Sequence, residues 1–376
     1  YKVALQATGP KAVGRVFVNM TPIKEIPDLA KLLAQDESNP LGALFFAGIL
    51  EALRGSTWLA LGMEVEADGL VLRAYADCQG MNPSGSAAFA LPSQAGQGAM
   101  PSLHVPRRIA ALSFYRDLYR FYAAKDDLFP ERTSQLIFFE NMMGIFFSGR
   151  DLTEEVLKGT RPEIRFVIAE QAYDPEAGIP QTQLPAFAAV LRLRDPKAFA
   201  EVVEEAWQKA VGLVNFTRGQ QAMPGLIIDR PLHEGTKLTL AYFSRAGIEE
   251  TENLHSRFNF RPSLALPQDY LILSSTDQLA RDLITAVSRE SQASNGPLAG
   301  AHSLARLDGA ALAAILKTNY QTLVRQNMVN DGKTAAEAEA TIDIFVALAQ
   351  FVKYVDLNIG MDQGQTQACL ELKLNL

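Results

Sequence analysis

Two segments near opposite ends of the chain share one hydrophobic pattern, and this repeat constrains the fold more than any other sequence feature. Residues 46–75, FAGILEALRGSTWLALGMEVEADGLVLRAY, align with residues 345–374, FVALAQFVKYVDLNIGMDQGQTQACLELKL, so that Gly62-Met63 matches Gly360-Met361. Each copy begins with an apolar helical pattern and continues into two alternating segments. The repeat therefore predicts two apolar helices, each leading into a β-hairpin.

The two hairpins are expected to turn at Asp68-Gly69 and at Gly364-Gln365. The first turn gives a wholly apolar face, in which the expected pairs are Leu59 with Cys78, Leu61 with Ala76, Met63 with Ala74, and Val65 with Leu72. The second turn pairs Ile359 with Leu370. On the opposite face we expect Gly62 and Gly360, facing Tyr75 and Cys369, to lie beneath a large side chain or an approaching partner.

Three acidic residues, Glu64, Glu66 and Asp68, occupy alternate positions of the first hairpin and raise the question of a cation site. A calcium loop of the EF-hand type needs a central glycine and a terminal bidentate glutamate, which this segment lacks. The second hairpin replaces most of these acids with amides but keeps the hydrophobic alternation. We therefore interpret the carboxylates as the polar side of a hairpin.

A second repeated pattern joins a strand to a helix through a capping residue. LRLRDPKAFAEVVEEA (191–206) and LARLDGAALAAILKTN (304–319) place Asp195 and Asp308 at the expected helix N-caps. RVFVNMTPIKEIPDLAKLLA (15–34) is a third version, with Thr21 at the cap. These units predict strands that alternate with helices.

The patterns together predict an α+β protein whose strand-helix and helix-hairpin units form mainly antiparallel sheets with helices packed on one face. We expect an N-terminal α+β module (1–79), a mobile Gly/Ser/Ala-rich loop (80–105), a middle α+β region (106–290) and a C-terminal α+β module (291–376) that echoes the first. The middle region is expected to open with a long aromatic helix over 108–131 and an apolar helix over 135–147.

Composition excludes several classes of protein. The net charge of −7 over 376 residues argues against a nucleic-acid partner, which requires a concentrated basic surface. No apolar run approaches the roughly 20 residues of a transmembrane helix. Two cysteines, Cys78 and Cys369, exclude a disulfide framework but leave one long-range disulfide open. Because the chain opens at Tyr1, either export with removal of a targeting segment or truncation is expected.

Motifs that carry chemistry are absent from the sequence. The chain has no phosphate-binding loop, no dinucleotide fingerprint and no nucleophile elbow. Its histidines, His104, His233, His255 and His302, are isolated from one another along the chain. We therefore predict no catalytic residue, no metal ligand and no cofactor.

The least ordinary feature is a concentration of aromatic residues between 108 and 147. The candidate contact residues for a partner or an apolar ligand are Phe138, Phe139, Phe146, Phe147, Tyr115, Tyr119 and Tyr122. The alternative, which we favour, is that aromatic side chains at helical spacing form the core beneath a sheet. If any of these segments is exposed, FFENMMGIFF (138–147) is the first choice.

Three segments carry a resemblance: ALRGSTWLALGMEV, LRLRDPKAFAEVVEEA and LALPQDYLILSSTDQLARDLI (264–284). In these the chain resembles uncharacterised bacterial secreted or envelope proteins built from repeated α+β units. The resemblance implies an extracytoplasmic protein, periplasmic, secreted or envelope-anchored, without assigned catalysis.

Three hypotheses for the function follow. The first is a non-catalytic structural or protein-interaction component of the bacterial cell envelope, which binds another protein or its own copies. The second is a carrier or sensor of an apolar ligand held by the aromatic helices 108–147. The third is an enzyme whose site is not visible in the sequence.

Overall fold

The computed structural model describes residues 8, 11–28, 40–77, 86–173, 178–244, 253–293, 296–362 and 364–376. The first module contains β1 (Gly14–Asn19), α2 (Met20–Ile23), α4 (Pro40–Gly55), β2 (Trp58–Glu66) and β3 (Gly69–Asp77). The last contains β12 (Ala301–Asp308), α10 (Gly309–Thr318), α11 (Tyr320–Asp331), α12 (Ala335–Phe351), β13 (Val352–Asp362) and β14 (Gln365–Leu374). In both, an apolar helix, α4 or α12, precedes the hairpin.

The middle region is longer and more varied. The segment before it contains η1 (Ser86–Ala90). Its first part contains β4 (Arg108–Tyr115), α5 (Leu118–Ala123), α6 (Lys125–Leu128), η2 (Pro130–Arg132), α7 (Thr133–Phe146), η3 (Leu152–Val156), η4 (Leu157–Gly159), β5 (Thr160–Ala169) and β6 (Ala186–Leu193). Its second part contains α8 (Pro196–Gln220), β7 (Leu226–Asp229), β8 (Leu232–His233), β9 (Thr236–Phe243), η5 (Ser256–Asn259), β10 (Ser263–Ala265), β11 (Tyr270–Ser274) and α9 (Asp277–Gln292).

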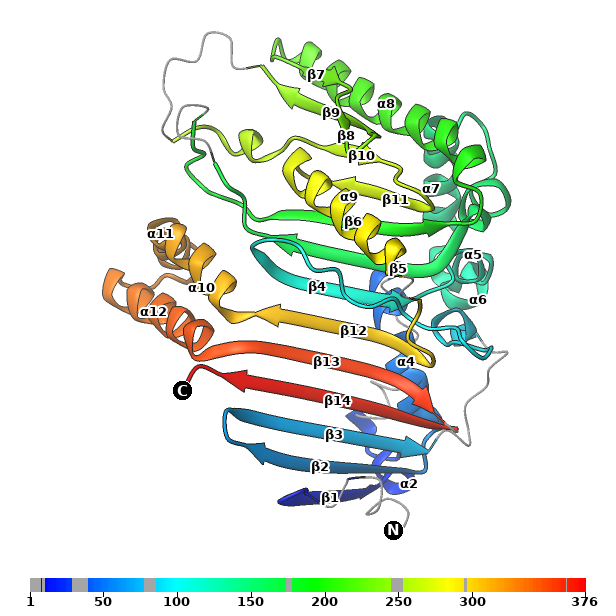
Figure 1. Ribbon diagram of the computed structural model, residues 1–376, viewed down its shortest axis with the longest axis vertical. Helices are drawn as coiled ribbons and strands as arrows, with labels where there is room; N and C mark the ends of the chain where they lie inside the picture. Colours follow the sequence, from blue (N-terminus) through cyan, green and yellow to red (C-terminus); the bar gives the residue numbers. More distant parts are fainter. Residues whose placement is uncertain are drawn as a thin grey trace.

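All the described strands belong to one 14-stranded sheet, in the order β1-β2-β3-β14-β13-β12-β4-β5-β6-β11-β10-β9-β7, with β8 beside β9 (Figure 1). Every pairing between these strands is antiparallel. The first and last modules meet through β3 and β14, and β12 joins them to β4. The predicted α+β class with antiparallel sheets is confirmed.

Helices cover both faces of the sheet in its second half, rather than one. On one face α9 buries Leu283 and Ile284 against alternate residues of β6 and β11, such as Val190. On the other face α8 buries Phe199 against Leu193, which points away from Val190 along β6. A strand between two such layers has apolar residues on both faces. Its sequence therefore lacks the alternation of apolar and polar residues that identifies a half-exposed strand.

The predicted helix over 108–131 is wrong in its first part, because residues 108–115 form β4. This strand lies inside the sheet, between β12 and β5, and Ile109, Ala111 and Phe114 are all buried. A strand buried on both faces has no polar alternation, so its apolar run is also compatible with a helix. The predicted helix over 135–147 is confirmed as α7.

The expected caps are found in part. The Asp195 side chain accepts hydrogen bonds from two backbone N–H groups of the first turn of α8. Asp308 lies at the N-cap of α10 without capping it, because its carboxylate accepts a hydrogen bond from Arg108 Nε at 2.7 Å. The cap predicted at Thr21 is wrong, since Asn19 caps α2 and accepts from the Thr21 N–H.

Both hairpins turn one residue earlier than predicted, so their pairing shifts by two residues. Leu61 faces Ala74, and Ile359 faces Ala368. Gly69 lies within β3, where only glycine fits because a β-carbon would overlap the carbonyl oxygen of Leu372 on β14. The alternation of faces is unchanged, since a two-residue shift preserves it. Cys78 lies outside the described residues.

The two matched glycines are explained by the chain's own backbone, not by a large side chain or a partner. A β-carbon on Gly62 would lie 2.9 Å from the carbonyl oxygen of Thr8. A β-carbon on Gly360 would lie equally close to the carbonyl oxygen of Gly300. Opposite them stand Arg73 and Gln367, instead of the expected Tyr75 and Cys369.

The loop predicted over 80–105 is described from residue 86 onward, where it is packed rather than mobile. It crosses the face of the sheet that α9 covers, and Leu103 and Val105 belong to the same core cluster as that helix. Ala99 and Met100 are also buried. The small residues of this segment therefore allow close packing on the sheet.

A buried arginine joins the three regions of the chain. Arg116, directly after β4, is 1% exposed and donates to six acceptors, all of them neutral. They are the carbonyl oxygens of Leu44 and Phe45 in α4, of Ala90, of Tyr115 and of His302, and Ser303 Oγ. Burial lowers the pKa of the Arg116 guanidinium to about 9. The charge is thus held by hydrogen bonds, without a carboxylate.

His302 lies beside this arginine and is fully buried. Its Nδ1 is 3.0 Å from Ser303 Oγ, and α4 approaches its ring at Gly48, where a β-carbon would lie 3.1 Å from the imidazole. Burial, followed by the charge of Arg116, lowers the pKa of His302 to about 3. The imidazole is therefore neutral at physiological pH.

Replacing Arg116 with methionine is expected to lower the free energy of unfolding by about 3–5 kcal/mol, because several buried acceptors lose their donor. Urea denaturation measures the change. The control is Arg120→Met, whose side chain is 56% exposed and whose loss costs less than about 1 kcal/mol. Equal effects of the two variants would contradict the role of Arg116.

Stability is expected to fall as His302 is forced to accept a proton. The unfolded chain binds this proton near the ordinary pKa of 6.5 and the folded protein only near about 3, so stability is lost as pH falls between these values. From about pH 7 to about pH 5 the wild type should lose about 2 kcal/mol more than His302→Gln. Parallel loss in both proteins, measured by urea denaturation, would contradict this.

Candidate functional site

One face of the strands that join the first and last modules is apolar and only partly covered. The pairing aligns its residues in rows across four strands; they are Leu61, Met63 and Val65 of β2, Leu70 and Leu72 of β3, Leu370 and Leu372 of β14, and Val355 and Leu357 of β13. We call this the apolar sheet surface. Val65 is 62% exposed, and Leu61, Met63 and Leu72 are each more than one-third exposed.

An apolar groove continues this surface at one end. It lies between α10, α12 and the sheet, has a volume of about 340 Å³, and is lined by apolar residues that include Leu307, Leu312, Phe345, Leu348 and Val355. Phe345 and Leu348 are each more than half exposed. Because Val355 belongs to both features, the groove and the apolar sheet surface are continuous.

The seven aromatic residues singled out from the sequence do not come together. Tyr115 is buried at the end of β4, where its hydroxyl donates to Gln97. The Tyr119 hydroxyl donates to Glu154. The Tyr122 ring lies 6.3 Å from the Phe139 ring, and burial raises the pKa of Tyr122. Phe147 packs on the core cluster beneath α8. Tyr115 lines a polar cavity that is described below.

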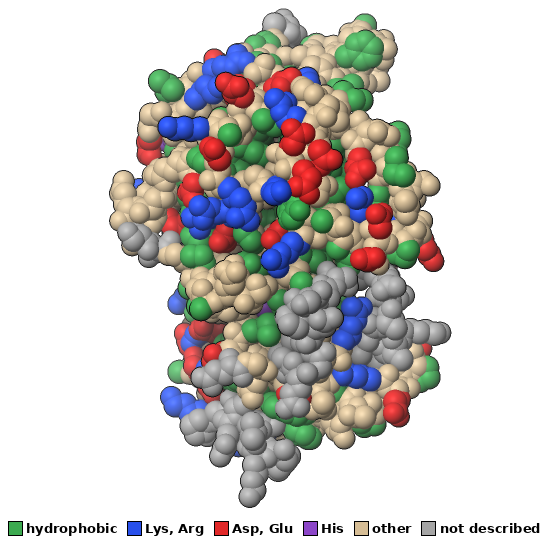
Figure 2. Space-filling view, turned by 90° about the vertical axis from the view of Figure 1, so that its right-hand side faces the viewer, with side chains coloured by type: hydrophobic (Ala, Val, Ile, Leu, Met, Phe, Trp, Pro, Cys, Tyr) green, Lys and Arg blue, Asp and Glu red, His purple; other side chains and the backbone are tan. Residues whose placement is uncertain are grey.

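α7, which carries Phe138, Phe139 and Phe146, has no buried residue. Phe138 and Ile145, two turns apart on the same side of the helix, are each 71% exposed, whereas Phe139 is 38% exposed. On this side of the molecule hydrophobic side chains are scattered among acidic and basic ones (Figure 2). We therefore regard the apolar sheet surface, with its continuous rows, as the better contact surface.

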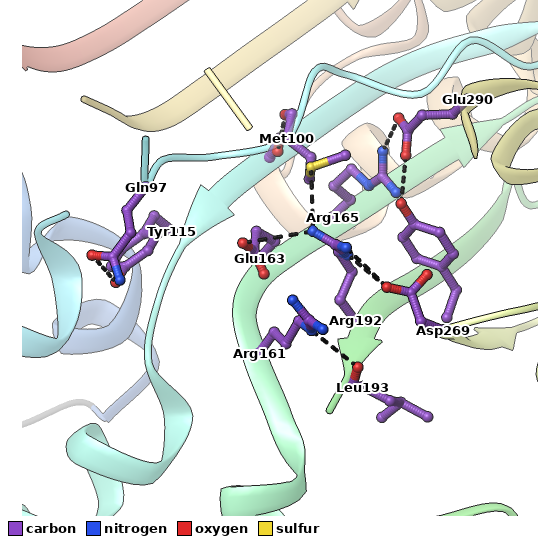
Figure 3. A network of polar contacts seen from close by, with 12 residues as sticks. Gln97, Met100, Tyr115, Arg161, Glu163, Arg165, Arg192, Leu193, Asp269 and Glu290 are labelled. Atoms are coloured by element: carbon purple, nitrogen blue, oxygen red, sulfur yellow. Dashed lines mark hydrogen bonds and ion pairs between the residues drawn. The ribbon is translucent and has the colours of Figure 1, made fainter. Parts of the chain in front are cut away.

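A polar network lies on the opposite face, between α9 and β5 (Figure 3). Arg165, 1% exposed, donates to Glu290 Oε2 at 2.6 Å, and the Tyr270 hydroxyl donates to Glu290 Oε1 at 2.7 Å. Burial is the main cause that raises the pKa of Tyr270 to about 12, and the hydrogen bond to Glu290 is the second cause. The Tyr270 hydroxyl therefore stays protonated. Arg192 donates to Asp269 at 2.9 Å.

A polar cavity of about 280 Å³ adjoins this network. It is lined by Ser93, Gln94, Gln97, Tyr115, Asp117, Arg120, Arg161, Pro162, Glu163 and Arg194. Apart from Tyr115, sequence reasoning missed these residues because they come from distant parts of the chain: the segment after η1, the segment from β4 into α5, the start of β5, and the residue after β6. The one local signal is the alternation of Arg192 and Arg194 in LRLRD, which shows a strand but not what its arginines face.

Within the described ranges, no helix combines the length and apolar character that crossing a membrane requires. In the same part of the chain, no three His, Cys, Asp or Glu side chains gather in a way that could hold a metal ion. Comparisons with protein-family models, curated proteins and solved structures found no match. The site must therefore be interpreted from its own geometry.

Replacing Glu290 with glutamine is expected to lower the free energy of unfolding by about 3 kcal/mol, because Arg165 is left buried without its carboxylate. Chemical denaturation measures the loss. The control Glu205→Gln removes an exposed carboxylate and should change stability little. Partial recovery in the double variant Arg165→Met with Glu290→Met would show that the unpaired charge causes the loss.

Proposed function

We propose that the protein is a non-catalytic structural or protein-interaction component of the bacterial cell envelope, which binds another protein or further copies of itself. The partial exposure of the apolar sheet surface carries this proposal. Leu61, Met63, Val65 and Leu72 lie side by side on paired strands, so their exposed area is contiguous. Contiguous apolar patches on soluble proteins typically mark binding surfaces.

The edge of the sheet beside this surface supports the same proposal. β1 pairs with β2, and in the described part of the chain it has no strand on its other side. Val16 lies opposite Leu61 and is 55% exposed, so the apolar rows reach this edge. An edge strand can add a partner's strand through its backbone groups while the adjacent apolar face buries side chains. The envelope location rests on the sequence resemblance.

A second candidate function is the carrying of an apolar ligand, which the groove beside α12 favours. Its lining is apolar, and its volume of about 340 Å³ lies at the lower end of the range of ligand pockets. Such a ligand would lie at residues 307–355, away from the aromatic segments 108–147 in which the sequence predicted it.

Charged substitutions on the apolar sheet surface should abolish association. We expect the wild type to self-associate with rising concentration, or to retain a partner when isolated from its source. Val65→Lys with Leu72→Lys should weaken this association at least about tenfold, because two lysines would be desolvated in the interface. Sedimentation velocity and native mass measurement give the readout.

The matched control is Val329→Lys on α11, an 82% exposed position away from this surface, which should associate like the wild type. A wild type that stays monomeric and retains no partner would refute the interaction proposal. If Leu348→Lys then weakens binding of a fluorescent fatty acid, the carrier function is favoured instead.

A further inference from the structure

Glu163 is a buried carboxylate with an unsatisfied oxygen. The residue is 9% exposed, lines the polar cavity, and its Oε2 has no hydrogen-bond partner. Its Oε1 lies 3.8 Å from Arg192 Nη1, a long contact, while Arg192 donates to Asp269 at 2.9 Å. Oε2 is enclosed by protein atoms, so a ligand in the cavity would meet this carboxylate through Oε1.

The backbone holds this carboxylate at the cavity by a bulge. Between Thr160 and Ile164 the pairing of β5 with β6 is interrupted, so extra residues of β5 face a shorter stretch of β6. The carbonyl oxygen of Pro162, inside the bulge, accepts a hydrogen bond from the Arg116 N–H at 2.6 Å. Bulges often redirect side chains beside functional sites. Arg116 therefore holds the residue before Glu163 through its backbone N–H and holds α4 through its guanidinium.

Arginines face the other part of the cavity. Arg161 donates through Nε to the carbonyl oxygen of Leu193, and Arg194 donates through Nε to that of Thr160. These bonds orient both side chains and leave their terminal Nη groups for a ligand. Arg120 also lines the cavity and pairs at 3.6 Å with Asp117, whose carboxylate caps α5. Figure 3 shows Arg161 beside Glu163, with no ion pair drawn between them.

We propose that this cavity binds a small zwitterion of the α-amino acid class, whose ammonium group donates to Glu163 and whose carboxylate accepts from Arg161 and Arg194. A simple anion would be repelled by Glu163, and a simple cation by the arginines, whereas a zwitterion satisfies both. The volume of about 280 Å³ restricts the ligand to a small molecule. This binding site is independent of the apolar sheet surface.

The test is isothermal titration calorimetry of the full chain with glycine, L-alanine and glycylglycine. Acetate and methylammonium serve as half-ligands, each carrying one of the two charges. At least one zwitterion should bind saturably, and each half-ligand should bind at least about tenfold more weakly, because charge-assisted bonds at both ends are required.

Two variants locate the ligand. Glu163→Gln keeps the side-chain shape but removes the charge, and should weaken zwitterion binding at least about tenfold. Arg194→Gln should weaken it similarly, and because Arg194 is exposed this variant folds even if Glu163→Gln does not. Arg150→Gln, an arginine away from the cavity, is the matched control and should bind like the wild type. Circular dichroism checks the fold of each variant.

Absence of saturable binding to all three zwitterions would overturn the proposal and leave a water-filled cavity. Binding of acetate as tight as that of glycine, unchanged in Glu163→Gln, would also overturn it, since the site would then recognise anions alone. Binding that is equally weakened in Arg150→Gln would place the ligand elsewhere.

Discussion

The hydrogen bonds of Arg116 are the constraint on which the arrangement of the chain depends. A guanidinium that is removed from water needs a hydrogen-bond acceptor for nearly every N–H group. Here acceptors come from α4, η1 and β12. α4 and β12 belong to the first and last modules, η1 to the segment 80–105, and Arg116 itself to the middle region. Packing them around one charge fixes how the first and last modules join the middle region, and the neutral His302 fills the remaining space beside α4.

The apolar sheet surface follows from the ratio of strands to helices. Fourteen antiparallel strands need helices on both faces to bury every apolar row, and in the second half α8 and α9 supply them. Across β2, β3 and β14 the rows continue, but side chains such as Val65 and Leu72 remain exposed. The strands of these hairpins alternate as core strands do, and their exposure supports the proposal of a contact made after folding.

The sequence predicts the helices and strands that depend on local periodicity. It does not predict those whose type or register is set by contacts with distant parts of the chain. α8 after Asp195 and α7 are recognisable because helical spacing and caps act within a few residues. β4 is not, because burial on both faces removes its alternation. The hairpin register depends on Gly69 meeting β14, about 300 residues away along the chain, which no local turn rule contains. The polar network is unpredictable for the same reason, since Arg165 and Glu290 meet only through the packing of α9.

The ion pairs of that network distinguish the adjoining polar cavity from a cavity that is filled only with water. Arg165 is matched by Glu290, and Arg192 by Asp269, so these two arginines of the network already have a close carboxylate. Glu163 is the additional carboxylate; it lies in the irregular part of β5 and lines the cavity. Replacing a buried carboxylate that has only one long ion pair with an apolar residue would ordinarily stabilise a fold. The proposed zwitterion would bring its ammonium group to the Oε1 side of Glu163 and its carboxylate to Arg161 and Arg194.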